Sequence, residues 1–354
     1  MKSWQITDFG AGEGISLNEI PEPPLGSGFV RIRVARTSVN HIDRLTIGGR
    51  FGWVTLPRTP GSEYVGTVEE VSPDAVDVFP GDRVAVFPKM FCGLCRYCAS
   101  GQESTCLGGW EPSRAPMDLS TNMLPVSMNG GWSETAVVPA RNAVRLPANL
   151  SFDDAFGIPL SGMTAWHMIR RARTVPGEKA IVMGSGGAIG LSALQILKIH
   201  GVSVLAVSST LAHMAELKRL GADAVSLPAQ EELDRELLEF AGKTGVDIVI
   251  DPLGQSTFQR SFMSLSPGGR YVTCGSLTGA SAELSILRLY SRQIELIGST
   301  TGSKRDLADA LEAASSGRLT MPVDSSYGFE NIPAAVQRHS ERGRFGKIRI
   351  SVSE

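Results

Sequence analysis

Four closely spaced cysteines form the strongest chemical signal in the sequence. Two residues separate Cys92 from Cys95 and Cys95 from Cys98, and seven more lead to Cys106. Thiolates at this spacing can wrap one tetrahedral zinc ion, and a shell of four thiolates leaves no open position for water or substrate. The spacing predicts one structural zinc per chain, in a lobe of about residues 89–108. An iron–sulfur cluster and four unligated cysteines are the alternatives.

A glycine-rich loop follows an apolar strand pattern at Lys179–Met183 and precedes a helical pattern. Glycines let backbone N–H groups approach a pyrophosphate, and a helix N-terminus favours negative charge. The strict G-x-G-x-x-G spacing is not met, but the position between strand and helix favours dinucleotide binding. The predicted contact residues are Gly184, Ser185, Gly186, Gly187, Ala188 and Ile189.

The end of the next predicted strand, Val202–Val207, bears on the choice of cofactor. An acidic residue at this place holds the 2′-hydroxyl of NAD and repels the 2′-phosphate of NADP. Here the strand is followed by Ser208 and Ser209, with His213 further on. Hydroxyl groups accept a phosphate without repulsion, so the sequence favours NADP, with NAD as the alternative.

Composition and charge limit the class of protein. The chain has 354 residues, 42% hydrophobic and 20% charged, which is typical of a globular protein of two domains. Its 34 basic and 36 acidic residues leave a net charge of -2, with no basic excess for nucleic acid or a membrane surface. The first residues lack the apolar core of a signal peptide, and no stretch approaches a membrane span. We therefore expect a cytoplasmic protein with a small-molecule substrate.

Two kinds of hydrophobic pattern along the chain predict the strands and helices that position these residues. Residues 1–150 show short alternating runs broken by Pro and Gly, such as Gly28–Val39, which indicates a β-rich, barrel-like domain. Residues 151–322 alternate strand and helix patterns, which predicts a doubly wound parallel sheet. Residues 323–354 end in a strand pattern that can return to the first domain. The predicted fold class is α/β.

Together these features resemble the medium-chain dehydrogenase/reductase superfamily over nearly the whole chain. The matching segments keep the family's order: PGSEYVGTVEEVS, FPGDRVAV, the cysteine lobe, GGWSE, the glycine loop and FGKIRI. The resemblance implies a GroES-like domain that carries the substrate site and a Rossmann domain that binds the nicotinamide cofactor. The active site is then the cleft between them.

The sequence departs from the zinc-dependent members of that family where they hold a catalytic zinc. The three matching positions here are Asn40, Ser62 and Leu160, which replace the usual thiol and imidazole ligands. Asn40 and the glycine loop look like the quinone-oxidoreductase branch, which works without metal. An improvised zinc site from His41, Asp43 and Glu63 is the alternative; otherwise Asp43 and Glu63 form a hydrogen-bonded pair that organises the cleft.

A metal-free cleft favours hydride transfer to an acceptor that needs no Lewis acid. Enals, enones, enoyl thioesters and quinones are such acceptors, because hydrogen bonds can stabilise the oxyanion that develops. We expect the Asn40 amide to be a donor and His41 or Tyr64 to be the proton source. The resemblance adds cofactor contacts at Thr164 and Lys347. Gly275, Ser276, Ser299 and Thr300 end later predicted strands and fit the far side of the nicotinamide pocket.

Two other functions and two structural expectations stay open at this point. The chain could be an alcohol or aldehyde dehydrogenase with an atypical zinc site, or a cofactor-binding protein without turnover. The resemblance implies a homodimer paired through Ile294–Ser299. The segment 109–129 is rich in Trp, Met, Leu and Pro, and we expect it to cover the cleft or extend the zinc lobe.

Overall fold

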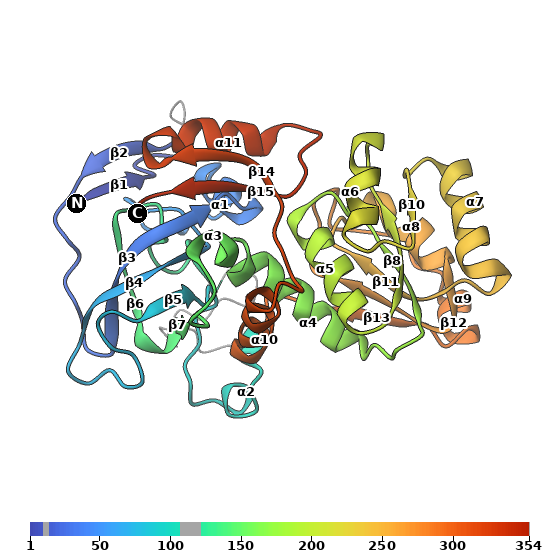
Figure 1. Cartoon of the computed structure of the whole chain (residues 1–354), viewed down its shortest axis with the longest axis horizontal. Coiled ribbons are helices and arrows are strands. Elements are labelled where there is room, and N and C mark those ends of the chain that lie inside the picture. The colour runs from blue at the N-terminus through green and yellow to red at the C-terminus, as the bar shows by residue number, and fades with distance from the viewer. Residues whose placement is uncertain (10–13, 107–121, 354) are drawn as a thin grey trace.

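The protein was analysed as a computed structural model that describes residues 1–9, 14–106 and 122–353. Two domains lie side by side, with the N-terminus and the C-terminus both in the left-hand domain of Figure 1. Both predicted parts of the α/β fold class are confirmed: one domain is built on an antiparallel sheet and the other on a parallel sheet. Most of the segment 109–129 lies outside the described residues.

The left-hand domain is built on a seven-stranded sheet of order β14-β15-β3-β4-β5-β7, in which β6 also pairs with β3. Val and Ile recur among polar residues along β3 and β4, which gives these two central strands a buried apolar face. The bounds are β3 (Phe29–Ser38), β4 (Tyr64–Val71), β5 (Arg83–Val86), β6 (Thr135–Pro139), β7 (Ala143–Arg145), β14 (Val323–Gly328) and β15 (Lys347–Ser351); a separate hairpin pairs β1 (Lys2–Gln5) with β2 (Ser16–Glu19).

The right-hand domain is a six-stranded parallel sheet of order β10-β9-β8-β11-β12-β13. Its central strands are almost wholly apolar, as expected for a parallel sheet covered by helices on both faces. The strands are β8 (Lys179–Val182), β9 (Ser203–Val207), β10 (Ala224–Ser226), β11 (Val246–Asp251), β12 (Leu265–Thr273) and β13 (Glu295–Gly298).

Helices connect and cover these sheets. Those of the first domain and its C-terminal return are α1 (His41–Ile47), α2 (Arg96–Ala99), α3 (Phe152–Ala155) and α11 (Ile332–Ser340), with short turns η1 (Glu103–Thr105), η4 (Ala140–Asn142) and η8 (Phe329–Asn331). Those of the second domain are α4 (Met163–Ala172), α5 (Ala188–Ile199), α6 (Met214–Arg219), α7 (Gln230–Ala241), α8 (Gln255–Met263), α9 (Ile286–Ser291) and α10 (Lys304–Ser315), with turns η6 (Leu211–His213) and η7 (Gly242–Thr244).

The chain leaves the second domain after α10 and returns to the first. Strand β15 runs antiparallel to β3, with Arg349 opposite Ser38, and parallel to β14. In Figure 1 this red C-terminal segment lies beside the blue β3, so strands from opposite ends of the sequence are neighbours in the sheet. The return places Lys347, at the start of β15, beside the loop that follows β3.

The helical pattern that starts at Ser151 is interrupted between the domains. Gly157 adopts a left-handed conformation with φ of 78°, and a π-helical turn, η5 (Ile158–Gly162), separates α3 from α4. Pro159 stands in the first turn of this segment, where a missing backbone donor is tolerated. Single-turn π-helices occur frequently at functional sites, and this one faces the space between the domains.

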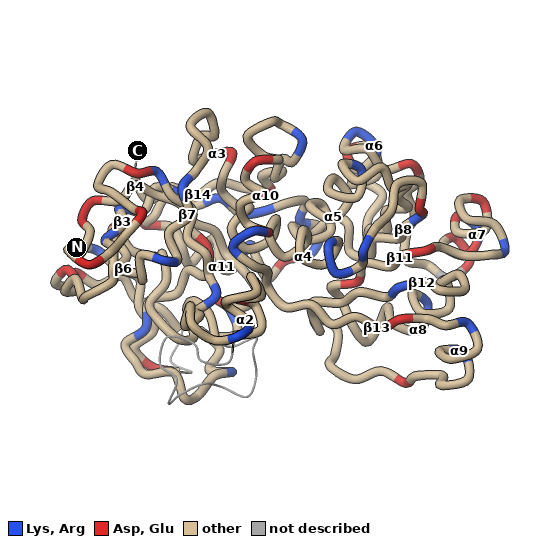
Figure 2. The backbone as a smooth tube through the Cα atoms, turned by 90° about the horizontal axis from the view of Figure 1, so that it is seen from below, with Lys and Arg blue, Asp and Glu red and all other residues tan. Residues whose placement is uncertain are grey.

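Charge and hydropathy agree with the expectations from composition. Figure 2 shows basic and acidic residues interspersed along the backbone of both domains, with acidic residues concentrated on α7. Among the described residues, no helix is long and apolar enough to span a membrane.

Candidate active site and metal site

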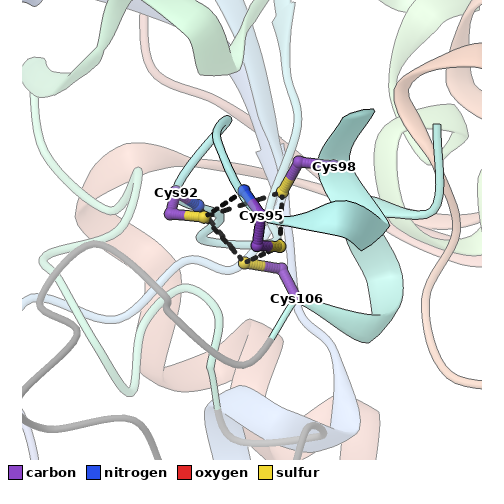
Figure 3. Close-up of side chains that lie close together, drawn as sticks. All are labelled: Cys92, Cys95, Cys98 and Cys106. Carbon is purple, nitrogen blue, oxygen red and sulfur yellow. Dashed lines mark hydrogen bonds between the residues drawn. The ribbon is translucent and has the colours of Figure 1, made fainter. Parts of the chain in front are cut away.

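The four cysteines converge on one point in the lobe after β5. Their sulfur atoms point toward one another in Figure 3, although they come from a loop, α2 and the end of η1. Neighbouring sulfurs lie 3.5–3.9 Å apart, and all four lie within 4.8 Å of one another. Zinc–sulfur bonds of about 2.3 Å in a tetrahedron require sulfur separations of roughly 3.8 Å. The donor set and its size therefore fit a structural zinc ion.

Burial raises the pKa of the Cys92 thiol, but hydrogen bonds from neighbouring backbone N–H groups bring it down to about 6. The N–H groups of Leu94 and Cys95 point at the Cys92 sulfur, at 3.5 and 3.3 Å, and the Cys92 N–H lies 3.3 Å from the Cys106 sulfur. The Arg141 guanidinium donates to the Cys92 carbonyl oxygen at 2.6 Å and ties the lobe to η4. Among the described residues, this cluster is the one group of three or more His, Cys, Asp or Glu side chains placed to share a metal.

A cleft of about 380 Å³ separates the two domains. Its walls come from the start of α1, the π turn, the glycine loop, the loops after β11 and β12, and the segment between α11 and β15. The polar and charged lining residues include Asn40, His41, Arg44, Ser161, His339, Arg344 and Lys347. The glycine loop contributes Gly184 and residues 187–190.

The glycine loop forms a cradle that fits a pyrophosphate. A Cβ atom on Gly187 would meet nothing nearer than 3.5 Å, because the residue faces open space at the start of α5. A Cβ atom on Gly190 would lie 2.4 Å from the Gly184 carbonyl oxygen, so this glycine permits close packing of α5 on the loop. The free N–H groups at the start of α5 suit a phosphate group.

The predicted adenosine end of the site is built on the loop after β9. Ser208 is buried, and its hydroxyl pairs with His213 Nδ1 at 2.8 Å. The His213 ring also packs at 4.9 Å from the ring of Phe345, which lies on the C-terminal return. Ser209, by contrast, is exposed. The C-terminal return, which the sequence predicted to reach the first domain, thus also packs against this loop of the second domain.

Several predicted cofactor residues lie outside the cleft lining. Thr164 is buried at the start of α4, and Gly275 and Ser276 line a separate pocket beside α8. The hydroxyls of Ser299 and its neighbour Thr301 are buried and have no hydrogen-bond partner. Such orphaned groups are expected where a bound ligand completes the hydrogen bonding. Thr300 follows Ser299 on the same segment.

The side chain of Lys347 reaches Asn40, one of the three positions at which a catalytic zinc ligand is replaced. Its ammonium donates to Asn40 Oδ1 at 2.7 Å and to Ser161 Oγ at 2.8 Å. It also forms an ion pair with Glu63, and both side chains are almost fully buried. Three acceptors thus surround one buried cation, and Lys347 is not a solvated surface charge.

Glu63 anchors this network from the start of β4. One oxygen accepts the Leu160 N–H at 2.7 Å, and the other accepts the Ser38 hydroxyl at 2.8 Å. Burial alone raises the pKa of Glu63, but the Lys347 ammonium and these hydrogen bonds hold it below its usual range. Glu63 is therefore a carboxylate whose oxygens are occupied, and this leaves no free oxygen for a metal.

Asp43 has a structural role next to the network. Its oxygens accept the backbone N–H groups of Asn40, Gly61 and Ser62 at 2.8–3.0 Å, as well as the Ser62 hydroxyl at 3.0 Å. Complete burial raises the pKa of Asp43 to about 6, against the opposing effect of these donors. Asp43 and Glu63 hold adjacent parts of the same loop, but the hydrogen bond expected between them is absent from the structure.

Tyr64 and His41, the two predicted proton sources, differ in whether they reach the cleft. Tyr64 is 1% exposed and packs among Val30, Val34 and other apolar residues of the barrel core. Its hydroxyl has no hydrogen-bond partner, and burial raises its pKa, so Tyr64 does not reach the cleft as a proton source. His41 does line the cleft, where burial and the charge of Arg44 lower its pKa.

A group of basic residues in the cleft was missed from the sequence. Arg44 on α1, His339 on α11 and Arg344 on the return segment converge on the cleft from three different elements. Burial, followed by the charges of Arg344, Arg44, Lys347 and His41, lowers the pKa of His339 to about 3. Nothing in the sequence signals this group, because its members come from segments that meet only where the C-terminal return pairs with the first domain.

Family models match most of the chain. Residues 26–148 match the alcohol dehydrogenase GroES-like domain, and residues 188–316 match the zinc-binding dehydrogenase family. An alcohol dehydrogenase from Geobacillus stearothermophilus is 30% identical over 96% of this chain and 96% of its own. An acryloyl-coenzyme A reductase from Metallosphaera sedula is 28% identical over 97% of this chain and 98% of its own.

Solved structures show the same arrangement. A thermostable alcohol dehydrogenase from Pyrobaculum aerophilum, determined with cobalt and zinc bound, superposes with a TM-score of 0.87. It is 34% identical to this chain, and the match covers 99% of both chains.

Proposed function

The chain belongs to the medium-chain dehydrogenase/reductase superfamily of oxidoreductases, and on that premise we propose that it transfers hydride to an activated carbon–carbon double bond or a quinone without a catalytic metal. The observation that carries the proposal is the Lys347 ammonium at the centre of the cleft, hydrogen-bonded to Asn40 at 2.7 Å. A second cation at this point would be repelled, and the surrounding oxygens are already engaged.

The three positions expected to hold a catalytic zinc support the same proposal. Asn40 accepts from Lys347, Ser62 donates to Asp43, and Leu160 contributes only its backbone N–H, to Glu63. These contacts engage the Asn40 oxygen, the Ser62 hydroxyl and the Glu63 carboxylate within one hydrogen-bond network. Zinc in a catalytic site needs about three protein ligands and an open position, which this network does not offer.

A site of this kind suits a conjugated acceptor. A simple alcohol needs a Lewis acid to lower its pKa, whereas an enone, enal, enoyl thioester or quinone needs hydrogen-bond donors near its oxygen. A reduced nicotinamide, when bound, supplies the hydride. The chain orients both partners with its cleft walls and provides the polar groups around the oxygen.

The cofactor in this proposal is NADPH, with NADH as the weaker donor. Ser208 and Ser209 at the end of β9 carry no negative charge, and Arg344 on the return segment adds positive charge to the cleft. Relatives from Sulfolobus acidocaldarius and other species carry names that specify NAD. Initial rates with NADPH and NADH at equal concentration test this part, and a clear preference for NADH would refute it.

The proposal is tested by NADPH oxidation with a panel of enals, enones, quinones and enoyl-coenzyme A thioesters, beside zinc analysis. The thioesters belong in the panel because two relatives are named acryloyl-coenzyme A reductases. We expect turnover of at least one acceptor class and one zinc per chain. Two firmly bound zinc ions per chain, or oxidation of simple alcohols alone, would instead support an alcohol dehydrogenase, the activity that the Geobacillus relative's name specifies. Tight NADPH binding without any turnover would support a binding protein.

We also propose that the protein is a homodimer paired through β13. This strand is the edge of the parallel sheet, so its outer backbone groups lack a neighbouring strand. Exposed apolar side chains surround it, with Leu296 at 40%, Ile286 at 61% and Tyr290 at 66% exposure. Light scattering after size exclusion should give twice the chain mass, and a Leu296→Arg variant should give the monomer.

A further inference from the structure

The hydroxyl group of Ser161 has an unusual position at the centre of the cleft. Ser161 lies on the π-helical turn η5, is 3% exposed and lines the cleft. Its oxygen accepts a hydrogen bond from the Lys347 ammonium at 2.8 Å. Among the described residues, its own hydrogen has no acceptor. A hydroxyl that receives one hydrogen bond and donates none has a free proton to offer.

The contacts of Lys347 hold that hydroxyl in place. The ammonium divides its three N–H groups between Asn40, Glu63 and Ser161. Because Glu63 is itself fixed by the Leu160 N–H and the Ser38 hydroxyl, the ammonium cannot swing away from Ser161. A hydroxyl that accepts a hydrogen bond from a cation is polarised, and the hydrogen bond that this hydroxyl donates becomes stronger.

The Asn40 amide cannot take this role. Its Nδ2 group points into the network, at 3.1 Å from Ser62 Oγ and 3.3 Å from Glu63 Oε2. Its oxygen is occupied by Lys347. The amide therefore has no donor directed at the cleft, and the expected role of Asn40 as the donor passes to the neighbouring hydroxyl.

We propose that Ser161 is the hydrogen-bond donor that stabilises the oxyanion of the substrate, and that Lys347 is the positioning residue that polarises it. The inference rests on the proposed reductase function. Hydride from NADPH adds to the β-carbon, the double-bond electrons move to the carbonyl oxygen, and Ser161 donates to the resulting enolate without losing its proton. A proton from bulk solvent then adds to the α-carbon, so that the acceptor and NADPH, with one H⁺, give the reduced product and NADP⁺.

A serine substitution tests the catalytic role. In Ser161→Ala, kcat/KM for the best acceptor should fall about 10²- to 10³-fold, as for loss of one oxyanion donor elsewhere. The dissociation constant for NADPH, measured by fluorescence, should stay unchanged. Ser226→Ala, a buried serine on β10 whose hydroxyl bonds to a backbone oxygen, is the matched control and should leave kcat/KM unchanged. Equal kcat/KM for Ser161→Ala and wild type would overturn the inference while leaving the reductase function intact.

A binding measurement tests the same site without turnover. A phenolate resembles an enolate oxygen, so 4-nitrophenol should bind to the NADP⁺-saturated protein in its ionised, yellow form. Ser161→Ala should weaken this binding at least about ten-fold and raise the pKa of the bound phenol. Phenolate binding that depends on Ser161 in a protein that reduces no acceptor would refute the reductase proposal and keep the donor assignment. Equal phenolate affinity in both proteins would overturn the donor assignment.

The role of Lys347 is tested in a background that keeps the buried charges balanced. The Glu63→Gln/Lys347→Met double variant removes both charges together, which avoids an unpaired buried carboxylate. If Lys347 polarises the Ser161 hydroxyl, the pKa of bound 4-nitrophenol should rise in this variant although Ser161 is present. An unchanged pKa of the bound phenol would show that Lys347 only supports the fold.

Discussion

The cysteine lobe and the centre of the cleft are two sites in which polar groups surround a cation. In the lobe the predicted cation is a metal ion, whereas in the cleft it is the ammonium group of a lysine. The four thiols of the lobe all come from one short segment, between Cys92 and Cys106. The cleft draws Asn40 and Glu63 from the first domain, Ser161 from the interdomain turn and Lys347 from the C-terminal return. The lobe suits a metal ion, whereas the cleft contains a cation of its own.

The difference bears on how the proposed reaction would proceed without a metal in the cleft. A metal ion has open coordination positions and can bind a substrate oxygen directly. An ammonium group has three hydrogens, and in this cleft all three point at protein acceptors. Its charge can reach a substrate only through another group, and the Ser161 hydroxyl is so placed. We therefore expect the two sites to respond differently to metal removal and to single substitutions.

The largest effect is expected from removal of two thiols. In Cys92→Ser/Cys95→Ser, zinc content should fall from one to none per chain, because two sulfur ligands cannot hold the ion. Loss of a structural metal should destabilise the chain by more than about 5 kcal/mol in urea unfolding. Cys274→Ser, outside the lobe, is the matched control and should keep both zinc and stability. Retention of zinc by the double variant would contradict the predicted ligand set.

A somewhat smaller effect is expected from Lys347→Met alone. The substitution leaves Glu63 as an unpaired buried carboxylate, which should cost about 3–5 kcal/mol of unfolding free energy. Adding Glu63→Gln should recover more than half of that loss, since the unpaired charge is then gone. If Lys347→Met proves as stable as wild type, the ion pair is not buried as the structure has it.

A pH-dependent effect is expected at His339. Its pKa is lowered from 6.5 to about 3 in the folded state. Below pH 6.5 the unfolded chain therefore takes up a proton that the folded chain refuses, and stability falls as the pH falls through this window. His339→Gln removes this penalty, so between pH 7.5 and pH 5 it should lose about 1–2 kcal/mol less than wild type in urea unfolding. Parallel losses in both proteins would argue against the cationic surroundings of His339.

The smallest effect is expected from chelation of metal. Brief treatment with 1,10-phenanthroline should change kcat by less than about two-fold, because the cleft uses no metal in the proposed reaction. Longer treatment should remove zinc and lower the thermal midpoint. Turnover that is lost immediately and is restored by added zinc would contradict the proposal. It would show that the cleft, like the cysteine lobe, depends on a metal.

Local patterns explain which features could be predicted. The zinc ligands and the glycine loop are short stretches whose chemistry depends on spacing along the chain, and the α/β architecture follows from repeated strand and helix patterns. Tyr64 shows the limit of such patterns. Tyr64 and Glu63 are neighbours near the start of β4, so they face opposite sides, and the pattern cannot tell which side is the cleft. The packing of the barrel core decides that Tyr64 is inside.

The sequence by itself determined the fold class, the cysteine ligand set and the absence of the usual zinc ligands at Asn40, Ser62 and Leu160. Only the tertiary structure decided what stands in their place. Lys347 lies 307 positions from Asn40 along the chain, yet their side chains are 2.7 Å apart because β15 pairs with β3. Contacts between distant segments depend on strand register and domain closure, which no local pattern records. The C-terminal return also brings the Lys347 ammonium to the Ser161 hydroxyl of the interdomain turn, which the sequence did not indicate.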